Sequence, residues 1–183
     1  MKITVELSTD GIKEARKQLK SYRNSLPRKC EAFVSKLADR GIQTATQHTG
    51  RYSGYIIFSK ELNRTADGCR GIMLATETGL IHRTWQDPSA PNGIAEADVS
   101  PLLMAEFGSG KKAEINPRGG EFGMGRGTFP GQIHAFDEHG WSWKEVGQDE
   151  WRHSLGEVPT MPMQSAMAEM ENAIFEVARE VFG

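Results

Sequence analysis

The segment Ser100-Pro101-Leu102-Leu103-Met104-Ala105-Glu106-Phe107-Gly108-Ser109-Gly110 joins an apolar block to a stretch rich in glycine. From residue 108 to residue 140 the chain carries many glycines and aromatic residues, but it shows no helical or strand period. Loops of this length are uncommon in compact domains and are usually functional or disordered. We therefore predict a single domain over residues 1–183, with an extended arm at residues 108–140 that contacts a partner.

The composition excludes several classes of protein. The formal net charge of −2 gives no overall attraction to nucleic acid or to an anionic membrane. No apolar run approaches the roughly 18 residues of a membrane span, and the N-terminus lacks the apolar core of a signal peptide. The two cysteines form no Cys-x-x-Cys pattern, which excludes cysteine-rich zinc sites. We expect a protein that is made and used in a cytoplasm.

The N-terminal residues predict a strand and two helices. Apolar and polar residues alternate over residues 2–7, as in a half-buried strand. A first helix is expected from about residue 10 to about residue 25, and Pro27 suits the first position of a second helix that ends near residues 46–49. The first helix has these apolar residues on its expected inner face: Ile12, Ala15, Leu19 and Tyr22.

The rest of the chain predicts a small sheet and a final helix. Residues 55–58, 70–76 and 80–85 are expected to form an antiparallel meander, followed by a loop at 86–98. Two short aromatic strands are expected at residues 141–145 and 150–154, and the last helix begins near Pro162. The predicted fold class is α+β, with a small antiparallel sheet packed against two N-terminal helices and a C-terminal helix.

Opposite charges gather at the two ends of the chain. Residues 13–40 carry nine bases and three acids, whereas residues 145–183 carry eight acids and two bases. The basic residues are typical of a solvated helix face, and they also fit a surface that binds an acidic partner or DNA. A basic front and an acidic back also fit front-to-back contacts between copies, which close into rings. The basic face consists of Lys13, Arg16, Lys17, Lys20 and Arg23.

The search for a reaction centre gives weak candidates. The sequence Gly108-Ser109-Gly110-Lys111-Lys112 resembles the end of a phosphate-binding loop, but it lacks the first glycine and the final Ser or Thr. His134, Asp137 and His139 are competent metal ligands at a spacing that matches no known motif. Two alternatives therefore stay open: a metal-dependent hydrolase that uses these three residues, and a DNA-binding module that uses the basic N-terminal helices.

The order of the motifs resembles the HK97 gp10-like family of tailed-phage proteins. The matching residues are Thr49-Gly50-Arg51 after the long helix, Pro101 to Gly110, and Met161 to Met167 before the last helix. The arm, with Gly120-Glu121-Phe122-Gly123-Met124-Gly125 and Thr128-Phe129-Pro130-Gly131-Gln132, is similar to a longer prophage subgroup of that family. The chain departs from the family pattern at residues 46–48, where the usual Ala-Pro-x-Asp is absent.

The resemblance implies a virion structural protein of the neck, the head–tail connector or the tail-completion apparatus. Members are taken to form rings, six-fold here, around the DNA channel, between a head-closure or connector protein and a tail-terminator or tail-tube protein. Non-specific contact with channel DNA is compatible with this role. The resemblance implies no enzyme activity, no catalytic residue, no metal and no cofactor. The expected interface residues are Glu106, Phe107, Phe122, Phe129 and Trp141.

Overall fold

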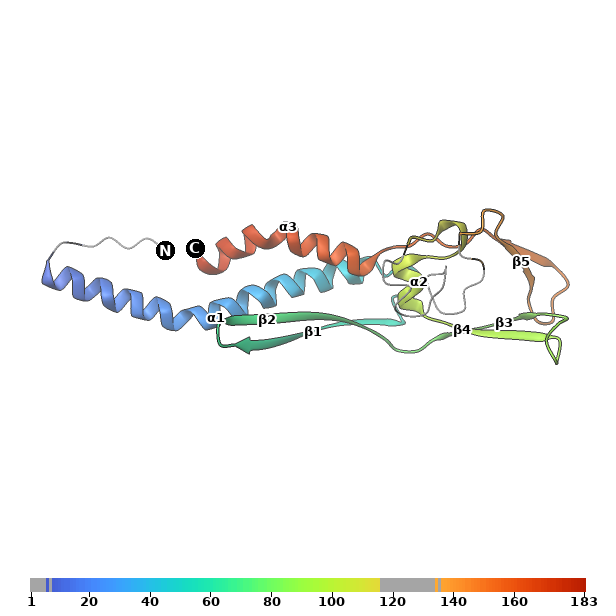
Figure 1. Ribbon diagram of the computed structural model, residues 1–183, viewed down its shortest axis with the longest axis horizontal. Helices are drawn as coiled ribbons and strands as arrows, with labels where there is room; N and C mark the ends of the chain where they lie inside the picture. Colours follow the sequence, from blue (N-terminus) through green and yellow to red (C-terminus); the bar gives the residue numbers. More distant parts are fainter. Residues whose placement is uncertain (1–5, 7, 116–133, 135) are drawn as a thin grey trace. The chain divides into compact units, whose positions relative to one another are not determined.

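The computed structural model describes Glu6, residues 8–115, His134 and residues 136–183. These residues form helices and two-stranded antiparallel sheets, so the predicted α+β class is confirmed (Figure 1). The chain divides into two units. The first runs to Gln43 and adds Ser59–Leu74 and Ala166–Gly183; the second comprises Thr44–Phe58 and Ala75–Ser165. Apart from Glu6, the expected strand at 2–7 lies outside the described residues, as do residues 116–133 and 135 of the arm.

The N-terminal region forms one continuous helix, α1 (Thr9–Gln47). Ser8 begins it, because its hydroxyl accepts a hydrogen bond from the Gly11 N–H at 3.0 Å. The prediction of two helices is wrong, since Pro27 lies inside α1. A proline inside a helix removes one backbone hydrogen bond and commonly produces a kink, but it does not have to end the helix. After Pro27 the helix packs against other elements of the first unit, which stabilises its continuation.

Helix α3 (Pro162–Phe182) starts at the predicted proline and packs along the later part of α1 in the first unit (Figure 1). The contact is close because Gly41 has no side chain. A Cβ at Gly41 would lie 2.8 Å from Sδ of Met170. The rings of Phe33 and Phe182 lie 5.8 Å apart, and Arg40 forms ion pairs with two glutamates of α3. A close approach at Gly41, an aromatic contact and opposite charges therefore join these two helices.

Strands β1 (Ile56–Thr65) and β2 (Gly68–Glu77) form a hairpin, and its part in the first unit lies against α1. Nζ of Lys60 donates to Oδ2 of Asp39 at 2.6 Å and to Oγ of Ser35 at 2.7 Å. A Cβ at Gly71 would collide with Cγ1 of Val34, so strand and helix pack closely there. Both strands extend further than their sequence patterns predicted.

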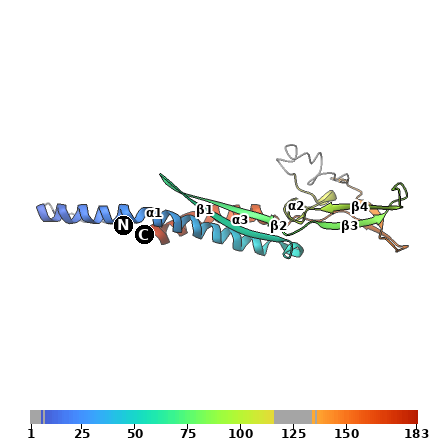
Figure 2. The ribbon, with the colours of Figure 1, turned by 90° about the horizontal axis from the view of Figure 1, so that it is seen from below.

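The predicted meander is wrong. Strand β3 (Ile81–Gln86) pairs with β4 (Ile94–Val99), from Ile81 opposite Val99 to Gln86 opposite Ile94 (Figure 2). Residues 94–99 were expected to be loop, because Pro88, Pro91 and Gly93 precede them and their apolar side chains are small. Pairing with β3 gives this weakly patterned segment its structure. The remaining pair, β5 (Trp141–Lys144) with β6 (Trp151–Ser154), is the predicted aromatic hairpin.

The core of the second unit lies where η1 (Gly50–Tyr52), β1 and α2 (Pro101–Phe107) meet. Tyr52, Ile56 and Ala105 are buried there, each no more than 5% exposed. Helix α2 is the apolar block of the opening motif. Ser100 begins it, since its hydroxyl accepts from the Leu103 N–H at 3.0 Å and Pro101 occupies the first turn. A short turn, η2 (Gly110–Lys112), follows α2.

Candidate interaction surfaces

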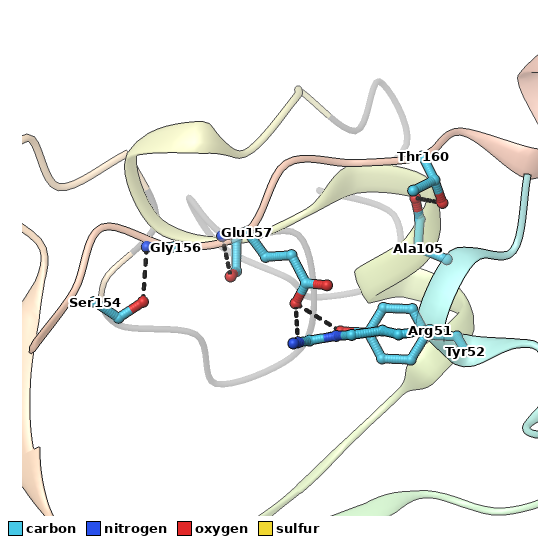
Figure 3. A network of polar contacts seen from close by, with 8 residues as sticks. Arg51, Tyr52, Ala105, Ser154, Gly156, Glu157 and Thr160 are labelled. Carbon is cyan, nitrogen blue, oxygen red and sulfur yellow. Dashed lines mark hydrogen bonds and ion pairs between the residues drawn. The ribbon is translucent and has the colours of Figure 1, made fainter. Parts of the chain in front are cut away.

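The motifs that carry the family resemblance meet at one polar junction in the second unit. Its centre is Glu157, in the segment before α3 (Figure 3). Oε2 of Glu157 accepts a hydrogen bond from the hydroxyl of Tyr52 at 2.7 Å. The same oxygen forms an ion pair with the guanidinium of Arg51. This carboxylate thereby joins the end of the Thr49-Gly50-Arg51 motif to the segment before α3.

The backbone of Ser109 and that of Glu157 pair as in a short antiparallel bridge. The Ser109 N–H donates to the Glu157 carbonyl at 2.9 Å, and the Glu157 N–H donates back at 3.1 Å. Gly156 permits this approach, because its φ is +97° and a Cβ would lie 2.6 Å from the Ser109 carbonyl carbon. Gly108 has a φ of +65°, and a Cβ there would lie 2.8 Å from Cδ of Pro159. These glycines are therefore required by close backbone packing.

Glu106 lies against the first turn of α3. Its two carboxylate oxygens accept from the backbone N–H groups of Met163 at 2.8 Å and Gln164 at 3.0 Å. The neighbouring Ala105 carbonyl accepts from the N–H groups of Thr160 and Met161 at 2.8 and 3.0 Å. A carboxylate is favoured at a helix N-terminus, where N–H groups have no partner within the helix. Glu106, which the sequence suggested as an interface residue, thus makes its contacts within its own chain.

The electrostatics of the junction favour a structural role. The Tyr52 side chain is buried, and this burial together with its hydrogen bond to Glu157 raises the pKa of Tyr52 to about 12. The phenol therefore stays protonated and donates to the carboxylate at neutral pH. Among Arg51, Tyr52 and Glu157 there is a cation, a neutral donor and an acceptor, each with a partner, and no nucleophile. This arrangement can fix two segments of the chain together, because each of the three polar side chains already has its partner within the chain.

Other predicted interface residues lie around the described ends of the arm. Trp141 is half-buried in β5, and its ring stacks on His134 with centroids 5.2 Å apart. Phe107 is half-buried, and its carbonyl accepts from the Glu114 N–H at 2.8 Å. Phe122 and Phe129 lie outside the described residues. The structure thus holds Phe107 and Trp141 in the body of the second unit.

The candidate metal ligands do not form a site. Nδ1 of His134 lies 3.7 Å from Oδ2 of Asp137, but Asp137 also accepts from the backbone N–H of His139 at 3.0 Å. Within the described part of the chain, no three His, Cys, Asp or Glu side chains are grouped so that they could hold a metal ion. The geometry therefore gives the hydrolase alternative no support.

The basic face predicted on the first helix lies on the N-terminal part of α1, and all of its residues are exposed. Among the described residues, the ion pairs of this face join neighbours on the same helix, Lys13 with Asp10 and Lys17 with Glu14. The expected inner face was wrong in part. Ala15 is buried, but Ile12 is 50% exposed and Leu19 is 56% exposed. The sequence pattern predicted Ile12 and Leu19 to be core residues, but in the structure they form an exposed apolar surface beside Arg16 and Arg23.

No helix among the described residues is both long enough and apolar enough to cross a membrane. Comparison of the chain with protein-family models, with curated proteins and with solved structures finds no match.

Proposed function

We propose that this chain is a structural subunit of a tailed-phage virion, acting in the neck, the head–tail connector or the tail-completion apparatus. In this proposal the subunits form a ring, six-fold by the family resemblance, around the DNA channel and join head to tail. The chain acts by binding its own copies and the adjoining head-closure and tail proteins. No catalytic step is part of the role.

The observation that supports the proposal is that the family-like motifs contact one another in the second unit, around Glu157 and Glu106. Residues from Thr-Gly-Arg, from the Glu-Phe-Gly-Ser-Gly stretch and from the start of α3 are all engaged in contacts within the chain. Such motifs build a rigid support, and a rigid support suits a subunit that presents surfaces to neighbours. A reaction centre would instead need accessible acid, base or nucleophilic groups.

The described ends of the arm give further support. The Phe136 N–H donates to the Gly110 carbonyl at 2.9 Å, and Gly110 packs closely on the ring of Trp141. The described parts of the chain before and after residues 116–133 are therefore held together at Gly110 and Phe136. We propose that this segment, with Phe122 and Phe129, binds a neighbouring subunit or the adjoining ring. Aromatic anchors commonly dominate the energetics of such interfaces.

The test uses the purified full chain and a variant in which residues 116–133 are replaced by a short Gly-Ser linker. Because the two ends are held together at Gly110, the variant should keep the circular dichroism spectrum and unfolding transition of the wild type. Native mass spectrometry and negative-stain microscopy should show closed rings for the wild type and none for the variant. Wild-type rings too narrow to admit duplex DNA, or a variant that assembles normally in virions, would contradict the proposal.

The same mass spectrum tests the two alternatives. A monomer with one bound metal ion per chain favours the hydrolase, and tight sequence-specific binding to duplex DNA favours the DNA-binding module. Weak binding that falls steeply with salt is expected of any basic surface and fits a ring around DNA equally well.

A further inference from the structure

The first half of α1 exposes a face on which apolar and basic side chains alternate. Ile12 and Leu19 are 50% and 56% exposed, and Arg16 and Arg23 are exposed beside them. Because successive residues of an α-helix lie about 100° apart around its axis, these four side chains fall on one side of the helix. In the first unit this part of α1 extends beyond both α3 and the β1–β2 hairpin (Figures 1 and 2). We call these four residues the α1 face.

Helix α3 exposes a face of complementary character on the side away from α1. Met167 is 54% exposed, Ile174 is 40% exposed and Phe175 is 80% exposed. The exposed Glu171 lies between them, four residues from Met167 and three from Ile174. We call these four residues the α3 face. Exposed apolar residues gathered in this way commonly mark a protein contact.

We infer that the α1 face of one chain binds the α3 face of a second copy. This inference rests on the proposed function, because it names the contact between subunits of the proposed ring. Arg16 and Arg23 then approach Glu171 of the other copy, while the exposed apolar side chains of the two helices pack together. The chain already joins these two helices within one molecule by the same chemistry, through the ion pairs of Arg40 with Glu169 and Glu176.

Charge and apolar surface favour the α3 face of a second copy over two other partners of the α1 face, which are a second α1 face and duplex DNA. If two α1 faces paired with each other, four arginines would meet in one interface, and like charges placed opposite each other are unfavourable. Duplex DNA would satisfy Arg16 and Arg23, but it would leave Ile12 and Leu19 exposed to water. The α3 face offers both a carboxylate and apolar surface.

The contact joins two different surfaces, so it is heterologous. Each copy retains one free α1 face and one free α3 face after a single contact forms, and further copies add at both ends. Such contacts close into a ring when the rotation between neighbours permits it, and otherwise they give an open filament.

The test compares the oligomeric state of charge-reversal variants of the full chain by sedimentation velocity and native mass spectrometry. We expect R16E/R23E and E171R to raise the dissociation constant about a hundredfold, because each places like charges across the contact. The triple variant R16E/R23E/E171R restores opposite charges and should regain assembly. Circular dichroism checks that every variant is folded, which is expected because all of these side chains are exposed.

K13E/K17E is the matched control, since it makes the same charge change within the basic face but about a quarter turn around the helix from Arg16 and Arg23, outside the α1 face. It should assemble like the wild type. Assembly of R16E/R23E at the wild-type level, failure of the triple variant to regain assembly, or a wild-type chain that stays monomeric at its highest soluble concentration would each overturn the inference. R16E/R23E that assembles but no longer binds duplex DNA would assign the α1 face to DNA instead.

The outcomes also separate this inference from the proposed function. Closed rings that are insensitive to these variants would leave the ring function standing and reject the helix contact. Open filaments that R16E/R23E abolishes would support the helix contact and argue against the ring.

Discussion

The hydroxyl of Tyr52 donates a hydrogen bond to Oε2 of Glu157 across 2.7 Å, which joins the residues after α1 to the segment before α3. The two residues are far apart in the sequence, and the bond is half-buried. The contact is therefore long-range and partly shielded from water. Its strength should be measurable in the stability of the whole chain.

The variant Tyr52→Phe should lower the free energy of unfolding by about 1.5 to 3 kcal/mol, the usual contribution of a hydrogen bond to a charged group. The ring remains and fills the same space, so the loss reports the hydroxyl and not the packing. Urea denaturation measures it. Tyr55→Phe is the control, because Tyr55 is 41% exposed and its change should leave the stability almost unaltered. Equal effects of the two substitutions would contradict the role of the Tyr52–Glu157 bond.

The contribution of Tyr52 should depend on pH in the alkaline range. The folded pKa of about 12 lies above the ordinary value of 10.0, so the folded state holds this proton more tightly than the unfolded state does. The stabilisation is complete below pH 10, declines from there and is lost above pH 12. The difference in unfolding free energy between wild type and Y52F should narrow over this window by about 2 kcal/mol. A difference that stays constant from pH 9 to 12, measured by urea denaturation, would contradict the raised pKa.

Removal of the Glu106 carboxylate should destabilise the start of α3. Glu106→Ala leaves the N–H groups of Met163 and Gln164 without their acceptor, and we expect a loss of about 2 kcal/mol. Glu106→Gln keeps one acceptor oxygen and should lose about half as much. Glu114→Ala controls for the loss of an exposed glutamate nearby. Hydrogen exchange at Met163 and Gln164 should quicken in the Glu106 variants, and unchanged exchange there would count against the contact.

Two glycine substitutions separate backbone strain from steric collision. Gly147 has a φ of +78° and open space around it, so Gly147→Ala should lose only about 1 kcal/mol. Gly156 has a φ of +97° and lies against the Ser109 carbonyl, so Gly156→Ala should lose at least about 3 kcal/mol or fail to fold. Thermal unfolding of the two variants gives the comparison. Similar melting temperatures of the two variants would contradict this prediction, because they would show that the Ser109 and Glu157 backbones can move apart at little cost in stability.

Elements with a strong local pattern were predicted well. The apolar stripe of α3 and its proline start placed that helix correctly, and the paired aromatic segments at 141–144 and 151–154 form the expected hairpin. Helix propensity and side-chain period act over a few residues, so they can be read directly from neighbouring positions. The α+β class follows from the same local patterns.

Elements that depend on distant partners were predicted badly. Pro27 looked like a boundary, but packing after it stabilises a helix that continues through it. Residues 94–99 looked like loop, but the long pairing with β3 makes them a strand. In both cases tertiary contacts outweigh a local preference. Even the cost of proline in a helix interior, about 3 kcal/mol relative to alanine, can be offset in this way.

The candidate interaction surfaces were likewise predicted only in part from the sequence. Spacing and charge alone marked the basic residues of α1, the Glu-Phe-Gly-Ser-Gly motif and the aromatic hairpin. Which partner each side chain meets was decided only by the fold, because a carboxylate such as Glu106 or Glu157 binds whichever donors the folded chain brings within about 3 Å. Ile12 and Leu19 have the spacing of core residues, and the absence of a covering element within the described first unit leaves them exposed. Local periodicity thus determined α3 and the β5–β6 hairpin, while long-range packing decided the continuity of α1, the β3–β4 pair and which helix faces are buried or remain free to bind.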